Sequence, residues 1–167
     1  MVDSGILDED DKIELIEGEI VPMASKGRRH ELLAEVLAEN WHRRMTQDFY
    51  VSIERQYNLG EATFVDPDII VRPAAIKTYD LKGPDALLVV EVADSSLKYD
   101  MGAKARIYAS FGVREYCVIN ALTFETSVHT QPGTAGYGSI IPVLPTLVLT
   151  PQLVPVLAVR LGDLDPA

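Results

Sequence analysis

The most constraining stretch of this chain is the run at residues 86–92, where a single acid, Glu91, interrupts hydrophobic residues. A short and nearly continuous apolar run is typical of a strand that is covered on both faces. The run therefore predicts a strand at the centre of a sheet. An ionised carboxylate in such a strand is costly unless it is paired or bound to a cation. Glu91 therefore marks either a structural ion pair or a cation site.

A second acid lies in the preceding apolar run. Residues 64–71 predict a neighbouring strand that contains Asp68 beside Pro67 and is closed by Pro73. Carboxylates on adjacent strands can share a hard, oxygen-ligated cation such as Mg²⁺. Such a cation polarises a phosphoryl oxygen and lowers the pKa of a bound water. Asp68 and Glu91 together indicate a divalent-metal site for phosphodiester chemistry.

The segment that follows residue 92 supplies an amine. Asp94, Ser95 and Ser96 predict the start of a helix that runs to about residue 110, and Gly112 suits its end. Asp100 and Lys104 are four residues apart, so they share one helical face. This spacing fits a surface ion pair. It also fits an ammonium that points at the metal site and stabilises charge on a phosphate.

The other segments predict a mixed α/β fold in which helices flank a sheet. A hairpin is expected at residues 13–21, with its turn at Glu17 and Gly18. Its acids Glu14, Glu17 and Glu19 most simply face solvent, and the alternative is that one of them approaches the site. Hydrophobic periodicity predicts an amphipathic helix at 27–45 and strands at 51–59 and 114–119. His30 on that helix either faces solvent or points into the site.

Composition limits the functions that the chain can have. Its 167 residues fit one domain over 1–167, with 1–10 as a loose end and 121–167 as a C-terminal extension. The net charge of −10 argues against a large basic surface for duplex DNA. The single cysteine, Cys117, excludes an internal disulfide and a thiolate zinc cluster. No signal peptide is recognised, so a cytoplasmic location is expected.

The C-terminal extension is apolar, and most of its length has no charged residue. Residues 126–159 contain no Asp, Glu, Lys or Arg, and four prolines interrupt their most hydrophobic part. Proline removes amide donors and disrupts helices, so short strands joined by proline turns are predicted rather than a membrane-spanning helix. This extension offers more hydrophobic surface than the core needs, so we expect it to form the interface of a homodimer.

Several stretches, taken in order, resemble a known nuclease pattern. They are residues 14–21, His30, residues 66–72, residues 88–97, Tyr99 with Asp100, Lys104, Tyr108 with Ala109, and residues 112–116. In this order they resemble the PD-(D/E)XK nuclease superfamily and, within it, the restriction endonuclease-like family Uma2. The resemblance implies a restriction-endonuclease-like core, which is a four-stranded mixed sheet flanked by helices. The hairpin and extra C-terminal strands would be added to that core.

The resemblance also implies roles for individual residues. Asp68, Glu91 and the backbone carbonyl of Val92 would bind Mg²⁺ or Mn²⁺. The superfamily usually has a lysine two residues after the second acid, where this chain has Ala93. The resemblance therefore assigns the catalytic lysine to Lys104, on the following helix. The supporting residues would be Glu54, Gln56, His30, Tyr99 and Asp100.

Three functions remain open from the sequence. The first is a Mg²⁺-dependent endonuclease that hydrolyses phosphodiester bonds in DNA by a metal-activated water. The second is a non-catalytic binding or assembly protein that retains the nuclease fold. The third is a metal-dependent hydrolase of a smaller phosphoester, which would tolerate the acidic surface better.

Overall fold

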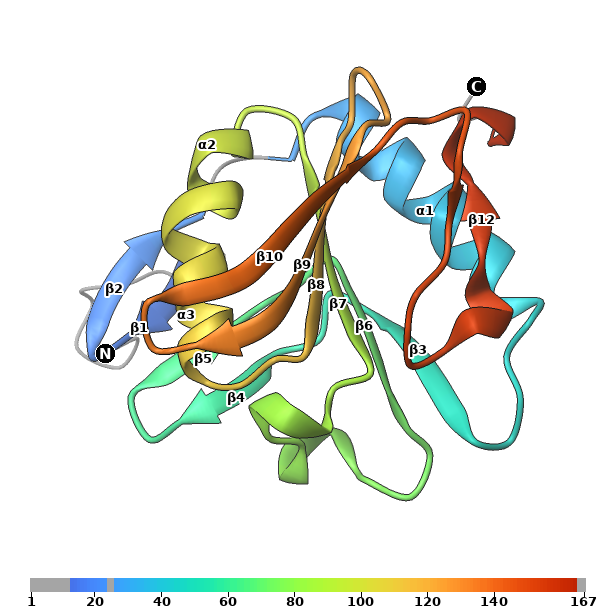
Figure 1. The fold of residues 1–167 in the computed structure, drawn as a ribbon. Helices are drawn as coiled ribbons and strands as arrows, with labels where there is room; N and C mark the ends of the chain where they lie inside the picture. Colours follow the sequence, from blue (N-terminus) through green and yellow to red (C-terminus); the bar gives the residue numbers. More distant parts are fainter. Residues whose placement is uncertain (1–12, 24–25, 165–167) are drawn as a thin grey trace.

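A mixed sheet of six strands forms the centre of the protein (Figure 1). The structure is a computed structural model that describes residues 13–23 and 26–164, so the expected loose end at 1–10 lies outside the described residues. The strands are, in spatial order, β10 Gly136–Val143, β9 Thr126–Gly133, β8 Glu115–Asn120, β7 Leu88–Ala93, β6 Ile69–Pro73 and β3 Phe49–Ile53. Of their pairings, β7 with β8 is parallel and the others are antiparallel.

The predicted central strand is confirmed as β7, all six residues of which are buried. Alternate residues along β7 enter different cores, as the two-residue period of a strand requires. Leu88, Val90 and Val92 pack under helix α1, Arg28–His42, whereas Val89 and Ala93 pack under helix α3, Ala105–Ser110. Figure 1 shows these helices on opposite sides of the sheet. Glu91 therefore lies on the α3 side of the sheet.

Two predicted strands are each divided between two sheets. The expected strand at 51–59 is wrong, because Glu54 adopts a left-handed φ of 46° and separates β3 from β4, Tyr57–Gly60. The expected strand at 64–71 is also wrong, because Asp66, Pro67 and Asp68 separate β5, Thr63–Val65, from β6. Proline has no amide hydrogen to donate to a ladder, so the pairing stops there.

The strands β4 and β5, which these breaks separate from β3 and β6, join two N-terminal strands in a second sheet. This sheet is antiparallel and has the order β2-β1-β5-β4. The predicted N-terminal hairpin is confirmed as β1, Ile13–Ile16, and β2, Glu19–Pro22. Its turn contains Glu17 at a φ of 51° and Gly18 at 86°, a region that glycine enters without steric cost. Leu15 of β1 pairs with Phe64 of β5, which brings the hairpin beside the break at Pro67.

The helical connection from β7 to β8 is continuous but not uniform. It consists of α2, Leu97–Tyr99, a π-helical turn η4, Asp100–Lys104, and α3. The predicted stop at Gly112 is confirmed, with a φ of 77°. A π turn holds one residue more than an α turn, and it buries both Asp100 and Lys104. The predicted helix at 27–45 is shorter than expected, since α1 begins after an extended Gly27 and ends at His42.

The C-terminal extension completes the sheet rather than standing apart from it. Strands β9 and β10 continue the central sheet beyond β8, so the expected four strands become six. The rest of the extension packs on the α1 side through Leu149, Leu157 and Leu161, with β11, Val148–Leu149, paired to β12, Val159–Arg160. Short 3-10 turns are η2 Thr78–Asp80, η3 Gly83–Asp85, η5 Pro155–Leu157 and η6 Leu161–Asp163. No helix within the described residues has the length and apolarity needed to cross a bilayer.

The packing of α1 against the sheet makes a testable prediction. Leu37 is fully buried in this core, so Leu37→Ala should lower the free energy of unfolding by about 2–5 kcal/mol through lost burial and a cavity. Glu35 is exposed on the same helix, so Glu35→Ala should change it by no more than about 0.5 kcal/mol. Urea unfolding followed by circular dichroism measures both, and equal effects would show that this helix face is not part of the core.

Candidate functional site

A cavity of about 390 Å³ lies where β6, β7, the start of α1 and the start of the α2–α3 connection meet. The antiparallel register pairs Ile69 with Val90, so the next position places Asp68 opposite Glu91. Directly opposite residues of an antiparallel pair point to the same face. The cavity is lined by Glu14, Val21, Pro22, Met23, Lys26, Gly27, His30, Asp68, Glu91, Val92, Asp94, Ser95, Ser96, Tyr99, Asp100 and Lys104.

Both carboxylate oxygens of Asp68 have partners. Lys26 Nζ lies 2.8 Å from Oδ1, while His30 Nε2 and the amide of Val92 each donate to Oδ2 at 2.8 Å. Burial alone would raise the pKa of Asp68, but the hydrogen bond and charge of His30, with the Lys26 ammonium, lower it to about 2. Asp68 is therefore a firmly ionised carboxylate at neutral pH, although it is only 4% exposed.

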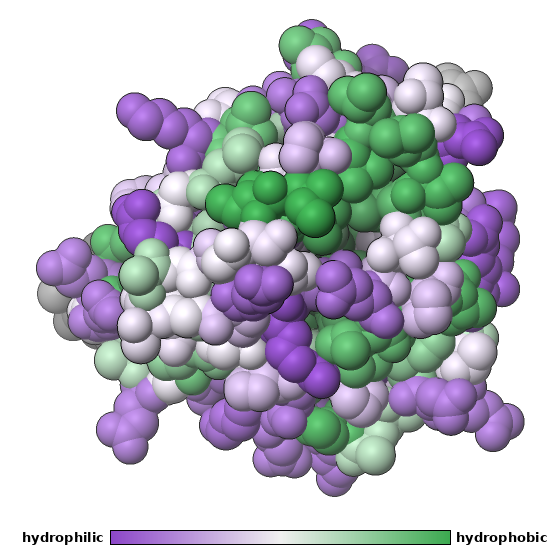
Figure 2. All heavy atoms as spheres, in the orientation of Figure 1, coloured by the Kyte–Doolittle hydropathy of each residue, from purple (hydrophilic) through white to green (hydrophobic). Residues whose placement is uncertain are grey.

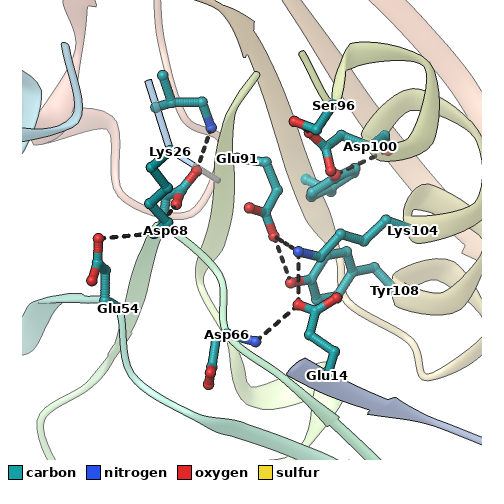
Figure 3. Close-up of polar contacts among 12 residues, drawn as sticks. Glu14, Lys26, Glu54, Asp66, Asp68, Glu91, Ser96, Asp100, Lys104 and Tyr108 are labelled. Carbon is teal, nitrogen blue, oxygen red and sulfur yellow. Dashed lines mark hydrogen bonds and ion pairs between the residues drawn. The ribbon is translucent and has the colours of Figure 1, made fainter. Parts of the chain in front are cut away.

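Glu91 belongs to a second cluster, centred on Lys104 (Figure 3). Lys104 Nζ donates to Glu91 Oε1 at 2.9 Å and to Glu14 Oε1 at 2.8 Å. Tyr108 also donates its hydroxyl hydrogen to Glu91 Oε1, at 2.9 Å. Burial would lower the pKa of Lys104, but the charges of Glu91 and Glu14 raise it, so the amine is an ammonium. Asp68, Glu91 and Lys104 were predicted to lie together, and all three line this one cavity.

Glu14 follows the second of the two alternatives for the hairpin acids, since it approaches the site instead of facing solvent. Its side chain is buried, because β1 of the second sheet lies across the cavity and turns residue 14 inward. Besides Lys104, Glu14 Oε1 accepts a hydrogen bond from the amide of Asp66 at 3.1 Å, beside the break that precedes β6. The alternation of Glu14 with hydrophobic residues looks the same for a solvent-facing acid, so the sequence held no signal to distinguish the two.

The supporting residues named from the sequence are only partly brought together. His30 and Asp100 are buried and line the cavity, and Tyr99 also lines it, with a hydroxyl oxygen that has no partner among the described residues. Asp100 accepts a hydrogen bond from Ser96. The prediction for Gln56 is wrong in position, since it is exposed beyond the Glu54 break and lines no part of the cavity.

Glu54 reaches the site only through a residue that sequence reasoning left out. Its carboxylate is half exposed and lies 2.8 Å from Lys26 Nζ. The side chain of Lys26 is only 10% exposed and contacts Asp68. Because Lys26 stands before the helix, outside any strand or helix period, no hydrophobic pattern could show where its ammonium points.

The donor set of the cavity fits a hard divalent cation. Five carboxylates line it, from Glu14, Asp68, Glu91, Asp94 and Asp100, against two ammonium groups, from Lys26 and Lys104. Only Oε1 of Glu91 is bonded among the described residues, which leaves Oε2 for a ligand at the cavity (Figure 3). The described residues contain no cluster of three His, Cys, Asp or Glu placed as metal ligands. Mg²⁺ usually keeps several waters and is held by one or two carboxylates.

The mixed sheet with flanking helices and two acids on adjacent strands is a restriction-endonuclease-like fold. The chain belongs to the Uma2 family, described as putative restriction endonucleases, which it matches over residues 4–161. The fold is also similar to a crystal structure of a putative nuclease belonging to DUF820 from Anabaena variabilis, with a TM-score of 0.72 and 13% sequence identity. That similarity covers 96% of this chain and 93% of the other. No curated protein matches the sequence.

The pKa of Asp68 predicts how stability depends on pH. Because this pKa falls from 3.8 to about 2 on folding, the ionised form stabilises the fold by about 2 kcal/mol. That contribution is complete above pH 4 or so and is lost as the pH falls towards about 2. The unfolding free energies of the wild type and Asp68→Asn should therefore differ most near neutral pH and converge in acid.

Urea titrations at about pH 6 and about pH 3 test this convergence. Asp80→Asn, at an exposed position on η2, serves as the matched control. A gap between the wild type and Asp68→Asn that widened in acid would contradict the pKa direction assigned to Asp68.

Proposed function

We propose that this protein is a metal-dependent nuclease that hydrolyses phosphodiester bonds in DNA. The observation that carries the proposal is the pairing of two buried carboxylates on adjacent strands, Asp68 and Glu91, with a buried ammonium, Lys104, at the same cavity. Membership of the Uma2 family and the likeness to a putative nuclease support it. A bound Mg²⁺ or Mn²⁺ would supply a polarised phosphoryl oxygen and a water of lowered pKa.

Each residue of the chain has a separate task in this proposal. Asp68, Glu91 and the carbonyl of Val92 would hold the cation, and His30 fixes Asp68 by its hydrogen bond to Oδ2. Tyr108 and Lys104 hold Oε1 of Glu91, so the other oxygen is directed to the cavity. The Lys104 ammonium also adds positive charge where negative charge develops on the phosphate.

The nuclease proposal predicts that shape-preserving changes at the two acids abolish cleavage. Asp68→Asn and Glu91→Gln should reduce the nicking of supercoiled plasmid in Mg²⁺ or Mn²⁺ by more than about 100-fold, the upper range for residues that only support metal ligands. Glu91→Gln should still fold, because Lys104 retains Glu14 as its partner. Glu115→Gln is a matched control, since Glu115 is a buried acid of the same sheet that does not line the cavity.

Isothermal titration with Mn²⁺, beside the nicking assay, separates the alternatives. The wild type could bind Mn²⁺, lose that binding in Asp68→Asn, and still fail to nick DNA. That outcome would indicate that the substrate is a smaller phosphoester rather than DNA. The net charge of −10 favours this hydrolase of a smaller phosphoester. A wild-type protein that neither binds Mn²⁺ nor nicks DNA would contradict catalysis and leave a binding or assembly role.

We also propose that the protein forms a homodimer through its C-terminal extension. Figure 2 shows hydrophobic side chains gathered over the face where β10 and the following segment run. The large hydrophobic side chains exposed in this region are Ile140, Ile141, Leu144, Leu147, Val148, Leu153 and Val156. A second copy suits this surface because residues 126–159 contain no Asp, Glu, Lys or Arg, whereas the chain as a whole is strongly acidic and repels itself.

Sedimentation tests this interface. At micromolar concentration the wild type should sediment as a dimer, and Ile141→Glu, which introduces like charges at the interface, should sediment as a monomer. Tyr79 is 88% exposed but lies on η2, away from this surface, so Tyr79→Glu should remain dimeric. A monomeric wild type would remove the proposal.

A further inference from the structure

Lys26 contacts the oxygen of Asp68, Oδ1, that a bound cation would also need. Its Nζ atom lies 2.8 Å from Asp68 Oδ1, and Oδ2 is already bonded to His30 and to the amide of Val92. Every oxygen of Asp68 is thus bonded within the protein, whereas Glu91 retains an oxygen without a partner among the described residues. The ammonium of Lys26 therefore occupies the position beside Asp68 Oδ1 that a bound metal would take.

The two lysines of the cavity are held very differently. Lys104 is fixed between Glu14 and Glu91, and the side chains of all three are at most 5% exposed. Lys26 is shared between buried Asp68 and Glu54, whose side chain is 53% exposed and can exchange its contact for water. An exposed ion pair contributes little, so Lys26 is the lysine that can leave.

The Lys26 side chain can move without its backbone. Gly27, the next residue, lies close to Asp94, since an added Cβ would lie 2.8 Å from Asp94 Oδ2. Lysine carries its charge on a flexible four-carbon stem. The ammonium can therefore swing within the cavity without displacing the helix that positions His30.

We propose that Lys26 is the resident counter-ion of Asp68 in the metal-free protein, that it yields Oδ1 when a divalent cation binds, and that it then contacts the substrate phosphate. This inference rests on the proposed metal-dependent function. An ammonium and a divalent cation on one carboxylate oxygen repel each other strongly at such short range. Once released, Lys26 is the lining ammonium that is not held between two buried acids, so it is the group free to meet an anion.

Mn²⁺ alone is the probe for the first half of this proposal. Isothermal titration should show that Lys26→Met binds Mn²⁺ about tenfold more tightly than the wild type, because the competing charge is gone. Lys26→Arg, which keeps the charge, should bind Mn²⁺ no more tightly than the wild type. Lys77→Met, at an exposed lysine outside the cavity, should match the wild type. Melting temperatures should show a less stable metal-free Lys26→Met that gains more from added Mn²⁺.

DNA binding tests the second half. In Ca²⁺, used in place of Mg²⁺ or Mn²⁺, Lys26→Met should bind a labelled DNA duplex more weakly than the wild type. Loss of one phosphate contact should also reduce the slope of log K against log salt by about 0.9. Unchanged DNA affinity and slope in Lys26→Met would overturn the phosphate contact.

The outcomes separate this inference from the nuclease proposal. If the wild type binds Mn²⁺ and Lys26→Met binds it equally or more weakly, the counter-ion role is overturned and the metal site stands. If neither protein binds Mn²⁺, both proposals fall. Binding by Lys26→Met alone would support the inference most directly, because the ammonium would then be what excludes the metal. Should Lys26→Met fail to fold, Lys26→Gln keeps a polar side chain without the charge and repeats the test.

Discussion

The structure depends on matching several buried charges within one small volume. Glu14, Asp68, Glu91, Asp100 and Lys104 are each at most 4% exposed, and none would be tolerated there alone. Lys104 pairs with two of these acids, Glu14 and Glu91, and Lys26 pairs with a third, Asp68. Replacing such a network with hydrophobic residues is often neutral or stabilising, so its presence is weak support for stability and stronger support for function.

The positive and negative charges at the cavity do not balance, because acidic side chains outnumber the lysines. Burial raises the pKa of Glu91, with Lys104 opposing the rise and Asp68 and Asp100 adding to it. Burial also raises the pKa of Asp100, with the hydrogen bond from Ser96 and the charge of Lys104 opposing the rise and the charges of Asp68 and Glu14 adding to it. Without a further positive charge, the cavity is thus left with carboxyl groups that resist ionisation. A divalent cation would relieve this resistance, because it favours the charged form of every acid near it.

The sequence predicted the central elements better than the edges of the fold. The apolar run around Glu91 has one reasonable structure, a buried strand, and the helix after it follows from its caps and from Gly112. The strands at 51–59 and 64–71 were predicted whole because alternation continues across Glu54 and across Pro67, and periodicity does not record a change of sheet. Strands were predicted in the C-terminal extension, but the sequence did not show that β9 and β10 pair with the central sheet, so the six-stranded extent was missed.

For the site, spacing could place Asp68, Glu91 and Lys104 but not their partners. An acid inside an apolar strand stands out in a sequence, whereas Glu14 alternates with hydrophobic residues as a solvent-facing acid would. Lys26 lies outside any periodic segment, and both residues become buried only through long-range packing. Glu14 and Lys104 are 90 residues apart in the chain, and Lys26 and Asp68 are 42 apart. Contacts of that separation depend on how two sheets and a helix terminus meet, which local patterns do not encode.

The parallel pairing of β7 with β8 has a consequence for how this protein can diverge. Parallel neighbours need a crossover, and here that crossover, through α2, η4 and α3, also delivers Lys104 to Glu91. Inserting or deleting one residue before Lys104 would rotate it by about 100° around the helix axis, away from its carboxylates. Length variation should therefore be concentrated in the loops outside the crossover, while the crossover itself changes by substitution only.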